Sequence, residues 1–163
     1  MDYHIYNLNG FINLKTLAPN EMFFYRIRKP DEITISFWVA DLSFFSTNGQ
    51  LIYCTPKNNP ACFLPPFETF NCVQWLDNGQ YAFFVEYSRS EKVLCILDLK
   101  NEICYKKNRG SSGPIESIIE DLQKNQDYST NRFIENGYNP FEINRNYLDR
   151  NYKKNIFKRW HPK

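Results

Sequence analysis

The side chains that most often carry nucleophilic and acid–base chemistry are few in this sequence and lie far apart. Its two histidines, His4 and His161, are near opposite ends of the 163-residue chain. A Ser–His or Cys–His pair needs an imidazole within hydrogen-bonding distance of the nucleophile, and terminal segments seldom hold a side chain that firmly. We therefore expect no catalytic residue, no enzymatic activity and no cofactor.

Cysteine is the next candidate for chemistry. The five cysteines are Cys54, Cys62, Cys72, Cys95 and Cys104. No two of them have the CxxC spacing that is usual in structural zinc sites. Cys72 and Cys95 lie inside apolar runs, where a free cysteine behaves as a small hydrophobic residue. We expect five reduced, buried thiols with no metal and no disulfide.

A glycine-rich segment, residues 109–114 (RGSSGP), lies between a predicted strand and a predicted helix, where phosphate-binding loops occur. It lacks the Gly-Lys-Ser/Thr ending of such loops. We interpret it as a link in which Gly113 caps the helix and Pro114 is the first helical residue. Anion binding at the helix N-terminus stays open as an alternative.

Carboxylates are scattered along the middle of the chain, at Glu68, Asp77, Glu86, Glu91, Asp98 and Glu102. A glycosidase needs two of them facing each other across a cleft, which sequence spacing does not show. Asp77 begins a turn, and Glu86 fits the solvent-facing side of a strand. The group forms either a solvated acidic surface or a surface that binds a basic partner. For the second interpretation the contact residues are Glu68, Asp77, Glu86, Glu91 and Trp160.

Charge is unevenly distributed, although the formal net charge is only +2. Residues 145–163 contain seven basic residues and one acidic residue, whereas residues 1–144 contain 13 basic and 17 acidic residues. The basic segment also contains tyrosine, phenylalanine and Trp160, a mixture found in proteins that bind single-stranded nucleic acid. Its rings can equally pack on the sheet while lysine and arginine face water. We expect such docking, so nucleic acid is not the expected partner.

The candidate side chains described above must be positioned mainly by β-strands. Residues 21–28 (EMFFYRIR) and 33–39 (ITISFWV) predict strands, the second because apolar and polar residues alternate. Asn-Gly pairs at residues 48–49 and 78–79 predict two hairpin turns. Residues 55–66 contain four prolines and predict a loop. The whole pattern predicts an antiparallel meander over residues 33–106.

The expected fold is mainly β (α+β): a curled antiparallel meander sheet of five to seven strands with one packed helix. The helix is predicted near residues 114–124, where Ile115, Ile118, Ile119 and Leu122 form one apolar stripe. Residues 147–160 place apolar residues four apart, which leaves a second helix open there. Residues 1–144 are expected to form a single domain, with residues 145–163 as a basic aromatic segment docked on it.

The sequence also indicates in which cellular compartment the protein is expected. No stretch approaches the roughly 18 apolar residues of a membrane span, so no membrane partner is expected. The first residues (MDYHIYNLNGF) lack the pattern of a signal peptide. Together with the reduced cysteines, this predicts a cytoplasmic protein.

In size, in its lack of a recognised catalytic motif and in its acidic body, the chain resembles the immunity proteins of bacterial toxin systems, such as those of contact-dependent inhibition or of type VI effectors. The resemblance is one of class, and no motif transfers residue roles. It implies tight, stoichiometric binding to a cognate toxin protein, which is thereby neutralised. The alternative is a nucleic-acid-associated or small-ligand-binding β-domain that uses the basic segment or a pocket in the sheet.

Overall fold

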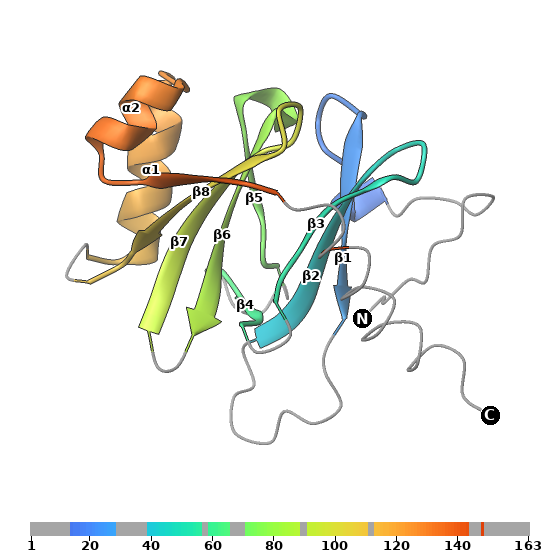
Figure 1. Cartoon of the computed structure of the whole chain (residues 1–163), viewed down its shortest axis with the longest axis horizontal. Helices are drawn as coiled ribbons and strands as arrows, with labels where there is room; N and C mark the ends of the chain where they lie inside the picture. Colours follow the sequence, from blue (N-terminus) through green and yellow to red (C-terminus); the bar gives the residue numbers. More distant parts are fainter. Residues whose placement is uncertain are drawn as a thin grey trace.

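The computed structural model describes residues 14–28, 39–56, 59–65, 71–88, 91–110, 113–143 and 148. Within these residues the protein is mainly β, with nine strands in one antiparallel sheet and two short α-helices (Figure 1). The strands are β1 (Phe23–Arg28), β2 (Val39–Ser46), β3 (Leu51–Cys54), β4 (Ala61–Cys62), β5 (Gln74–Leu76), β6 (Tyr81–Ser88), β7 (Glu91–Asp98), β8 (Ile103–Asn108) and β9 (Asn139–Glu142). The helices are α1 (Ile115–Asn125) and α2 (Thr130–Glu135).

Paired strands follow the order β1-β2-β4-β6-β7-β8-β9, with β3 added to β2 and β5 added to β6. Figure 1 shows two groups of strands, β1–β3 and β5–β8, joined through the short strand β4. This junction is small. Strand β4 pairs with β2 at two positions and with β6 at one, where Ala61 is opposite Glu86.

Several details of the predicted sheet are wrong. The sheet has more than the expected five to seven strands and is neither curled nor closed, since β1 and β9 are at its two ends. Residues 55–66 were expected to be a loop, yet they contain β4. That strand needs only three backbone pairs and lies between Pro60 and Pro65, so the prolines do not interrupt it. Consecutive strands pair as in a meander from β1 to β3 and again from β5 to β8, but β4 interrupts the predicted meander by pairing with β2 and β6.

Both Asn-Gly hairpin turns are confirmed, as is the strand at residues 21–28, which is β1. Residues 33–38 lie outside the described residues. The turn from β5 to β6 has positive φ at Asp77, Asn78 and Gly79. Glycine is required at position 79 because a Cβ atom there would lie 2.7 Å from the Cβ of Ala18.

The hydrophobic core covers both faces of β6 and β7. On β6, Ala82 and Phe84 face the β1–β3 group, whereas Phe83 and Val85 face the helices. Phe44 of β2 contacts Phe84, with ring centroids 5.3 Å apart. Burial on both faces explains why these strands read as continuous apolar runs instead of alternating ones.

Helix α1 confirms the predicted helix. Its apolar stripe (Ile115, Ile118, Ile119 and Leu122) packs against the core on the helix-covered face of the sheet. Pro114 is the N-cap instead of the first helical residue, so the helix begins one residue later than predicted. Because α1 extends over three turns, its periodicity is readable from sequence.

The expectation of a single helix is wrong, because the sequence does not predict α2 or β9. Helix α2 has six residues and buries only Phe133, which is too little for a readable period. Strand β9 buries none of its side chains and contains Pro140, so it lacks both signals of a strand. Both elements depend on contacts with β8, through Phe133 on Tyr105 and through backbone pairing.

One residue of the C-terminal segment is described. Leu148 is 4% exposed and belongs to the core between the β1–β3 group and β6–β8. This supports docking of the segment at that point. Leu148 itself is helical, but the rest of the alternative helix at residues 147–160 and the docking of Trp160 fall outside the described residues and stay predictions.

Candidate functional site

The residues predicted to contact a partner do not form one site. Glu68 and Trp160 lie outside the described residues, as do His4 and His161. Asp77 and Glu91 are exposed, but they stand at opposite ends of the β6–β7 hairpin. The eight-residue strand β6 separates them, a distance of about 25 Å at the usual rise per residue.

Glu86 departs furthest from the sequence prediction. It is 1% exposed, so its assignment to the solvent-facing side of a strand is wrong. Side chains alternate along a strand, and Glu86 therefore shares the face of Ala82 and Phe84, toward the β1–β3 group. The sequence does contain a signal for the burial of Glu86. The unbroken apolar run before this residue indicates that β6 has no solvent-facing side.

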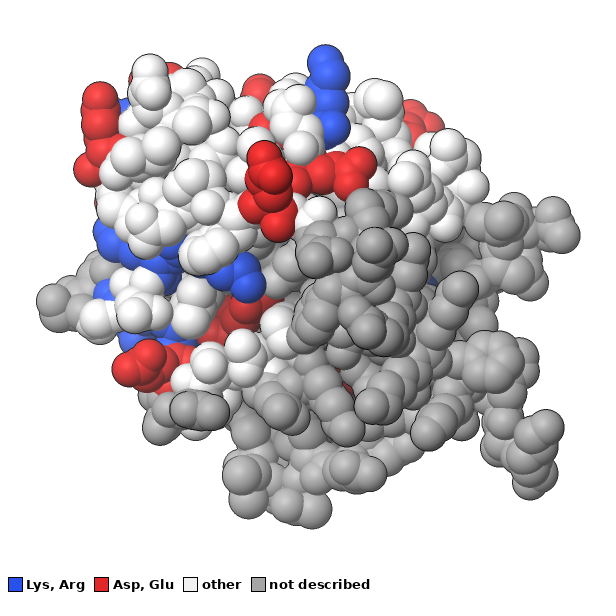
Figure 2. All heavy atoms as spheres, in the orientation of Figure 1, with Lys and Arg blue, Asp and Glu red and all other residues white. Residues whose placement is uncertain are grey.

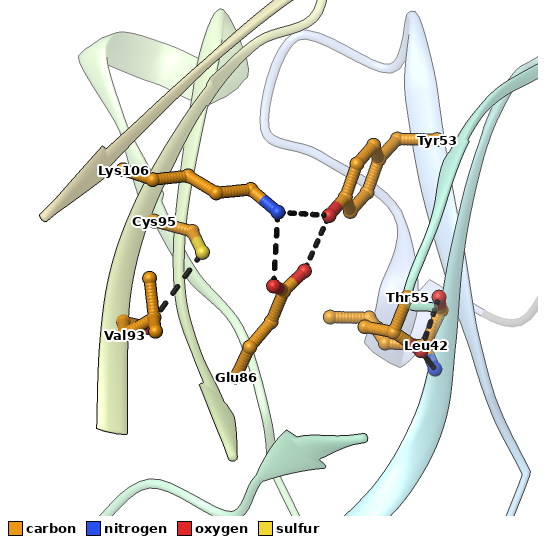
Figure 3. Close-up of polar contacts among 7 residues, drawn as sticks. All are labelled: Leu42, Tyr53, Thr55, Glu86, Val93, Cys95 and Lys106. Carbon is orange, nitrogen blue, oxygen red and sulfur yellow. Dashed lines mark hydrogen bonds and ion pairs between the residues drawn. The ribbon is translucent and has the colours of Figure 1, made fainter. Parts of the chain in front are cut away.

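Glu86 forms a polar cluster with Tyr53 of β3 and Lys106 of β8 (Figure 3). The Tyr53 hydroxyl donates a hydrogen bond to Oε2 of Glu86. The Lys106 ammonium donates to Oε1 of Glu86 and to the hydroxyl oxygen of Tyr53, each at 3.0 Å. Its Nζ also lies 5.5 Å from the centroid of the Tyr53 ring. This Tyr53–Glu86–Lys106 cluster connects the two groups of strands.

The register of the sheet places Lys106 within reach of the carboxylate. Lys106 pairs with Cys95 of β7, whose side chain lies in the core that the two groups of strands share. The long aliphatic part of Lys106 extends across β7 toward Glu86 (Figure 3). The Lys106 side chain is 23% exposed and that of Glu86 is 2% exposed. The cluster therefore reaches the protein surface only at the lysine.

Both proton donors of the cluster hold their protons firmly. Burial raises the pKa of the Tyr53 phenol well above its usual range, and the Glu86 carboxylate raises it further. Burial lowers the pKa of the Lys106 ammonium, but Glu86 and the neighbouring thiols raise it by more, so the net shift is upward. An activated nucleophile or base needs the opposite shift. The arrangement suits a structural charge pair.

Such a pair adds little net stability, and its main effect is on the relative position of the strands that it joins. Replacing a buried ion pair by apolar residues is often neutral, whereas removing one partner costs about 3–5 kcal/mol. Here the pair connects strand groups whose backbone junction is the two-residue strand β4. The cluster and the shared core thus both link the β1–β3 group to β6 and β8.

Three other charged side chains hold turns and chain connections. Asp98 accepts hydrogen bonds from the backbone N–H of Asn101 at 3.1 Å and from its side-chain amide at 2.9 Å. Lys107 donates to the carbonyl of Asn136 at 2.8 Å, at the C-terminal end of α2. Arg109 donates to the carbonyl of Gly113 at 2.7 Å, across the segment considered for phosphate binding. These contacts stabilise the scaffold.

All five cysteines are buried free thiols, which confirms their predicted place in the core. Burial raises the pKa of Cys62 to about 11 and that of Cys72 and Cys95 well above the usual range. Such thiols stay protonated and are poor nucleophiles. Within the described ranges, no three Cys, His, Asp or Glu side chains are grouped so that they could hold a metal ion.

Exposed carboxylates concentrate instead in what we call the helical layer, residues 113–143. This layer contains six acidic and two basic residues, a formal charge of −4. All six carboxylate residues are exposed: Glu116, Glu120, Asp121, Asp127, Glu135 and Glu142. The amphipathic pattern of α1 already implies that Glu116 and Glu120 face outward, so the exposure of these two carboxylates could be predicted from the sequence.

A small hollow of about 240 Å³ lies between the two helices and includes open solvent. Its lining includes Tyr128, Arg132 and Asn136. In the part of the chain that the structure describes, neither helix is long and apolar enough to cross a membrane.

Comparisons with protein-family models, with curated proteins and with solved structures each find no match. The functional argument therefore rests on the residues of this chain.

Proposed function

We propose that this protein is an immunity-type inhibitor that neutralises a cognate bacterial toxin by direct, stoichiometric binding. The observation that carries the proposal is the exposed carboxylates of the helical layer, with a formal charge of −4 over residues 113–143. Such a surface suits a partner with a basic surface, as nucleases have because they bind phosphate backbones. Complementary charge speeds association and favours one partner over others.

The interior of the protein supports a binding role in a second way. The Tyr53–Glu86–Lys106 cluster and the shared aromatic core hold the two groups of strands in one arrangement. A surface that is already rigid loses less conformational entropy when a partner binds. The proposal assigns no catalytic step to the chain.

Protection of cells is the direct test. Where a toxin domain is encoded beside the gene of this chain, we expect co-expression of the chain to restore growth to cells that make that toxin domain. Changing both histidines, His4→Ala and His161→Ala, should leave protection intact. Loss of protection in that variant, with its fold preserved, would favour an enzyme.

Charge reversal tests the surface that carries the proposal. Glu120→Lys on the outer side of α1 should weaken binding to the toxin domain, and increasingly so at low salt, where charge attraction is strongest. Glu91→Lys is the matched control, since Glu91 is also exposed but lies at the far end of the β6–β7 hairpin. Equal binding by the two variants would count against the helical layer as the contact surface.

A further inference from the structure

We propose that three basic side chains beside the helical layer, Lys92, Lys107 and Arg109, form a second contact with the toxin and bind acidic residues on it. We call these three residues the basic patch. The inference rests on the proposed function and adds to it the chemistry of the toxin surface, which must carry an acidic zone beside its basic one.

The register of the sheet brings the patch together on one face. Tyr87 of β6 is paired with Lys92 of β7, and the backbone N–H of Arg109 donates to the carbonyl of Lys92 at 2.9 Å. Tyr87 points to the same face as Val85, which packs in the core beneath the helices, because alternate residues of a strand share a face. Lys92 shares that face as the cross-strand partner of Tyr87.

Hydrogen bonds place the other two cations on the same face, at the border of the helical layer. The Lys107 ammonium donates to the carbonyl of Asn136 at 2.8 Å, and the Arg109 guanidinium donates to that of Gly113 at 2.7 Å. Both acceptors belong to the helical layer, residues 113–143. They are neutral carbonyl groups, so these two hydrogen bonds do not neutralise the cations.

The patch is accessible to a partner. Lys92 is exposed, Lys107 and Arg109 are partly exposed, and the adjacent Tyr87 is 36% exposed. Within the described chain Lys92 makes no ion pair. Figure 2 shows blue side chains gathered at the left of the molecule, where β7 begins and β8 ends in Figure 1.

Folding does not explain this grouping of charge. The register continues one position beyond β8 and sets Lys92 opposite Arg109, and like charges directly opposite each other destabilise a sheet. A neutral residue at position 92 would therefore serve the fold better. Exposed tyrosine and arginine are both enriched at protein interfaces, which fits a role in contact with a partner.

The position of the patch indicates which partner it fits. It borders a layer with a formal charge of −4, so a long anion such as a nucleic-acid strand would be repelled on one side. A protein surface can match both signs, with basic residues against the helical layer and acidic residues against the patch. Two neighbouring contacts of opposite sign also fix the orientation in which the toxin binds.

Reversing the charge of Lys92 tests the patch, because a toxin surface that is only basic predicts tighter binding. With the acidic zone proposed here, Lys92→Glu should weaken binding to the toxin domain about tenfold at low salt. The loss should shrink as salt is added. Lys100→Glu is the matched control, since it makes the same change of charge at an exposed residue beyond the other end of β7 and should not weaken binding. Both variants should melt like the wild type, because both side chains are exposed.

The outcomes separate the two proposals. If the wild type binds the toxin domain and Lys92→Glu binds as tightly or more tightly, the basic patch is wrong and the proposed function stands. If the wild type does not bind the toxin domain, both proposals fail. If sedimentation shows a wild-type dimer that Lys92→Glu converts to a monomer, the patch binds a second copy of this chain and the inference is overturned.

Discussion

The ammonium of Lys106 lies 3.0 Å from the carboxylate of Glu86, although β7 separates their strands in the sheet. The lysine spans that strand to reach a carboxylate whose side chain is 2% exposed. Tyr53 completes the contact from the other group of strands. The pair, together with the shared core, therefore links two groups of strands whose backbone junction is only the two-residue strand β4.

Removing the charge of Lys106 should destabilise the protein more than removing the charge of Glu86. Lys106→Met leaves the buried Glu86 carboxylate without a counter-charge and should lower the free energy of unfolding by about 3–5 kcal/mol. Glu86→Leu should cost less, because the Lys106 side chain is 23% exposed and its ammonium can turn to water. Denaturant unfolding followed by circular dichroism measures both values.

Two further variants control this comparison. Lys124→Met removes an exposed ammonium and should change the free energy of unfolding by no more than about 0.5 kcal/mol. The double variant Glu86→Leu/Lys106→Met should be more stable than Lys106→Met, since no buried charge is left alone. A larger loss from Glu86→Leu than from Lys106→Met would contradict this account of the pair.

Alkaline pH should destabilise the protein. The pKa values of Tyr53 and Lys106 are raised in the folded state, and those of Tyr81 and Tyr138 are raised to about 12. Groups with raised pKa values stabilise the fold fully below their unfolded pKa and lose that effect as the pH rises through the folded pKa. Unfolded tyrosine and lysine titrate at about pH 10, so the free energy of unfolding should fall from there toward about pH 12.

Urea unfolding at several pH values through that range measures the slope. Tyr53→Phe should make the decline shallower, because one of the groups that bind protons more tightly in the folded state is gone. A free energy of unfolding that is constant through the range would show that these phenols and the ammonium are not buried as described.

Gly79 should be irreplaceable for steric reasons. A Cβ at this position would lie 2.7 Å from the Cβ of Ala18, and the residue has φ of 95°. Gly113 has φ of 92° but no atom within 4 Å of an added Cβ. Gly113→Ala should cost about 1–2 kcal/mol for the backbone alone, and Gly79→Ala distinctly more. Equal melting temperatures of the two variants would refute the close approach between the β5–β6 turn and Ala18.

Leu148 should contribute to stability as a core residue, although it lies in the basic C-terminal segment. It is 4% exposed among residues of the shared core. Leu148→Ala should lower the free energy of unfolding by about 2–5 kcal/mol, the range for buried leucine. Calorimetric melting checks this value. An unchanged melting temperature would mean that the segment leaves the core in solution.

The sequence predicts best where the cause of structure is local. The Asn-Gly turns and the stripe from Ile115 to Leu122 are readable because positive φ and helical periodicity involve neighbouring residues. Glu86 is misread because its burial depends on strands far away in the sequence. The alternation along β6 places it on one face, but only the packing of β3 on that face shows that the face is closed.

The same reason limits prediction of the candidate surface. Strand β9 and helix α2 exist because β8 offers an edge and Tyr105 offers a ring, and neither is visible in residues 130–142 alone. The acidic helical layer could be predicted from the outward side of α1. The placement of α2 and β9 beside β8 could not, since it depends on residues far away in the sequence.

Titration calorimetry of the purified toxin domain with the purified wild-type chain tests the central claim most directly. The account predicts saturable binding at one chain per toxin domain, with toxin activity falling in proportion to the fraction bound. Complete loss of toxin activity at a small fraction of one equivalent, or full activity in the presence of excess chain, would contradict it.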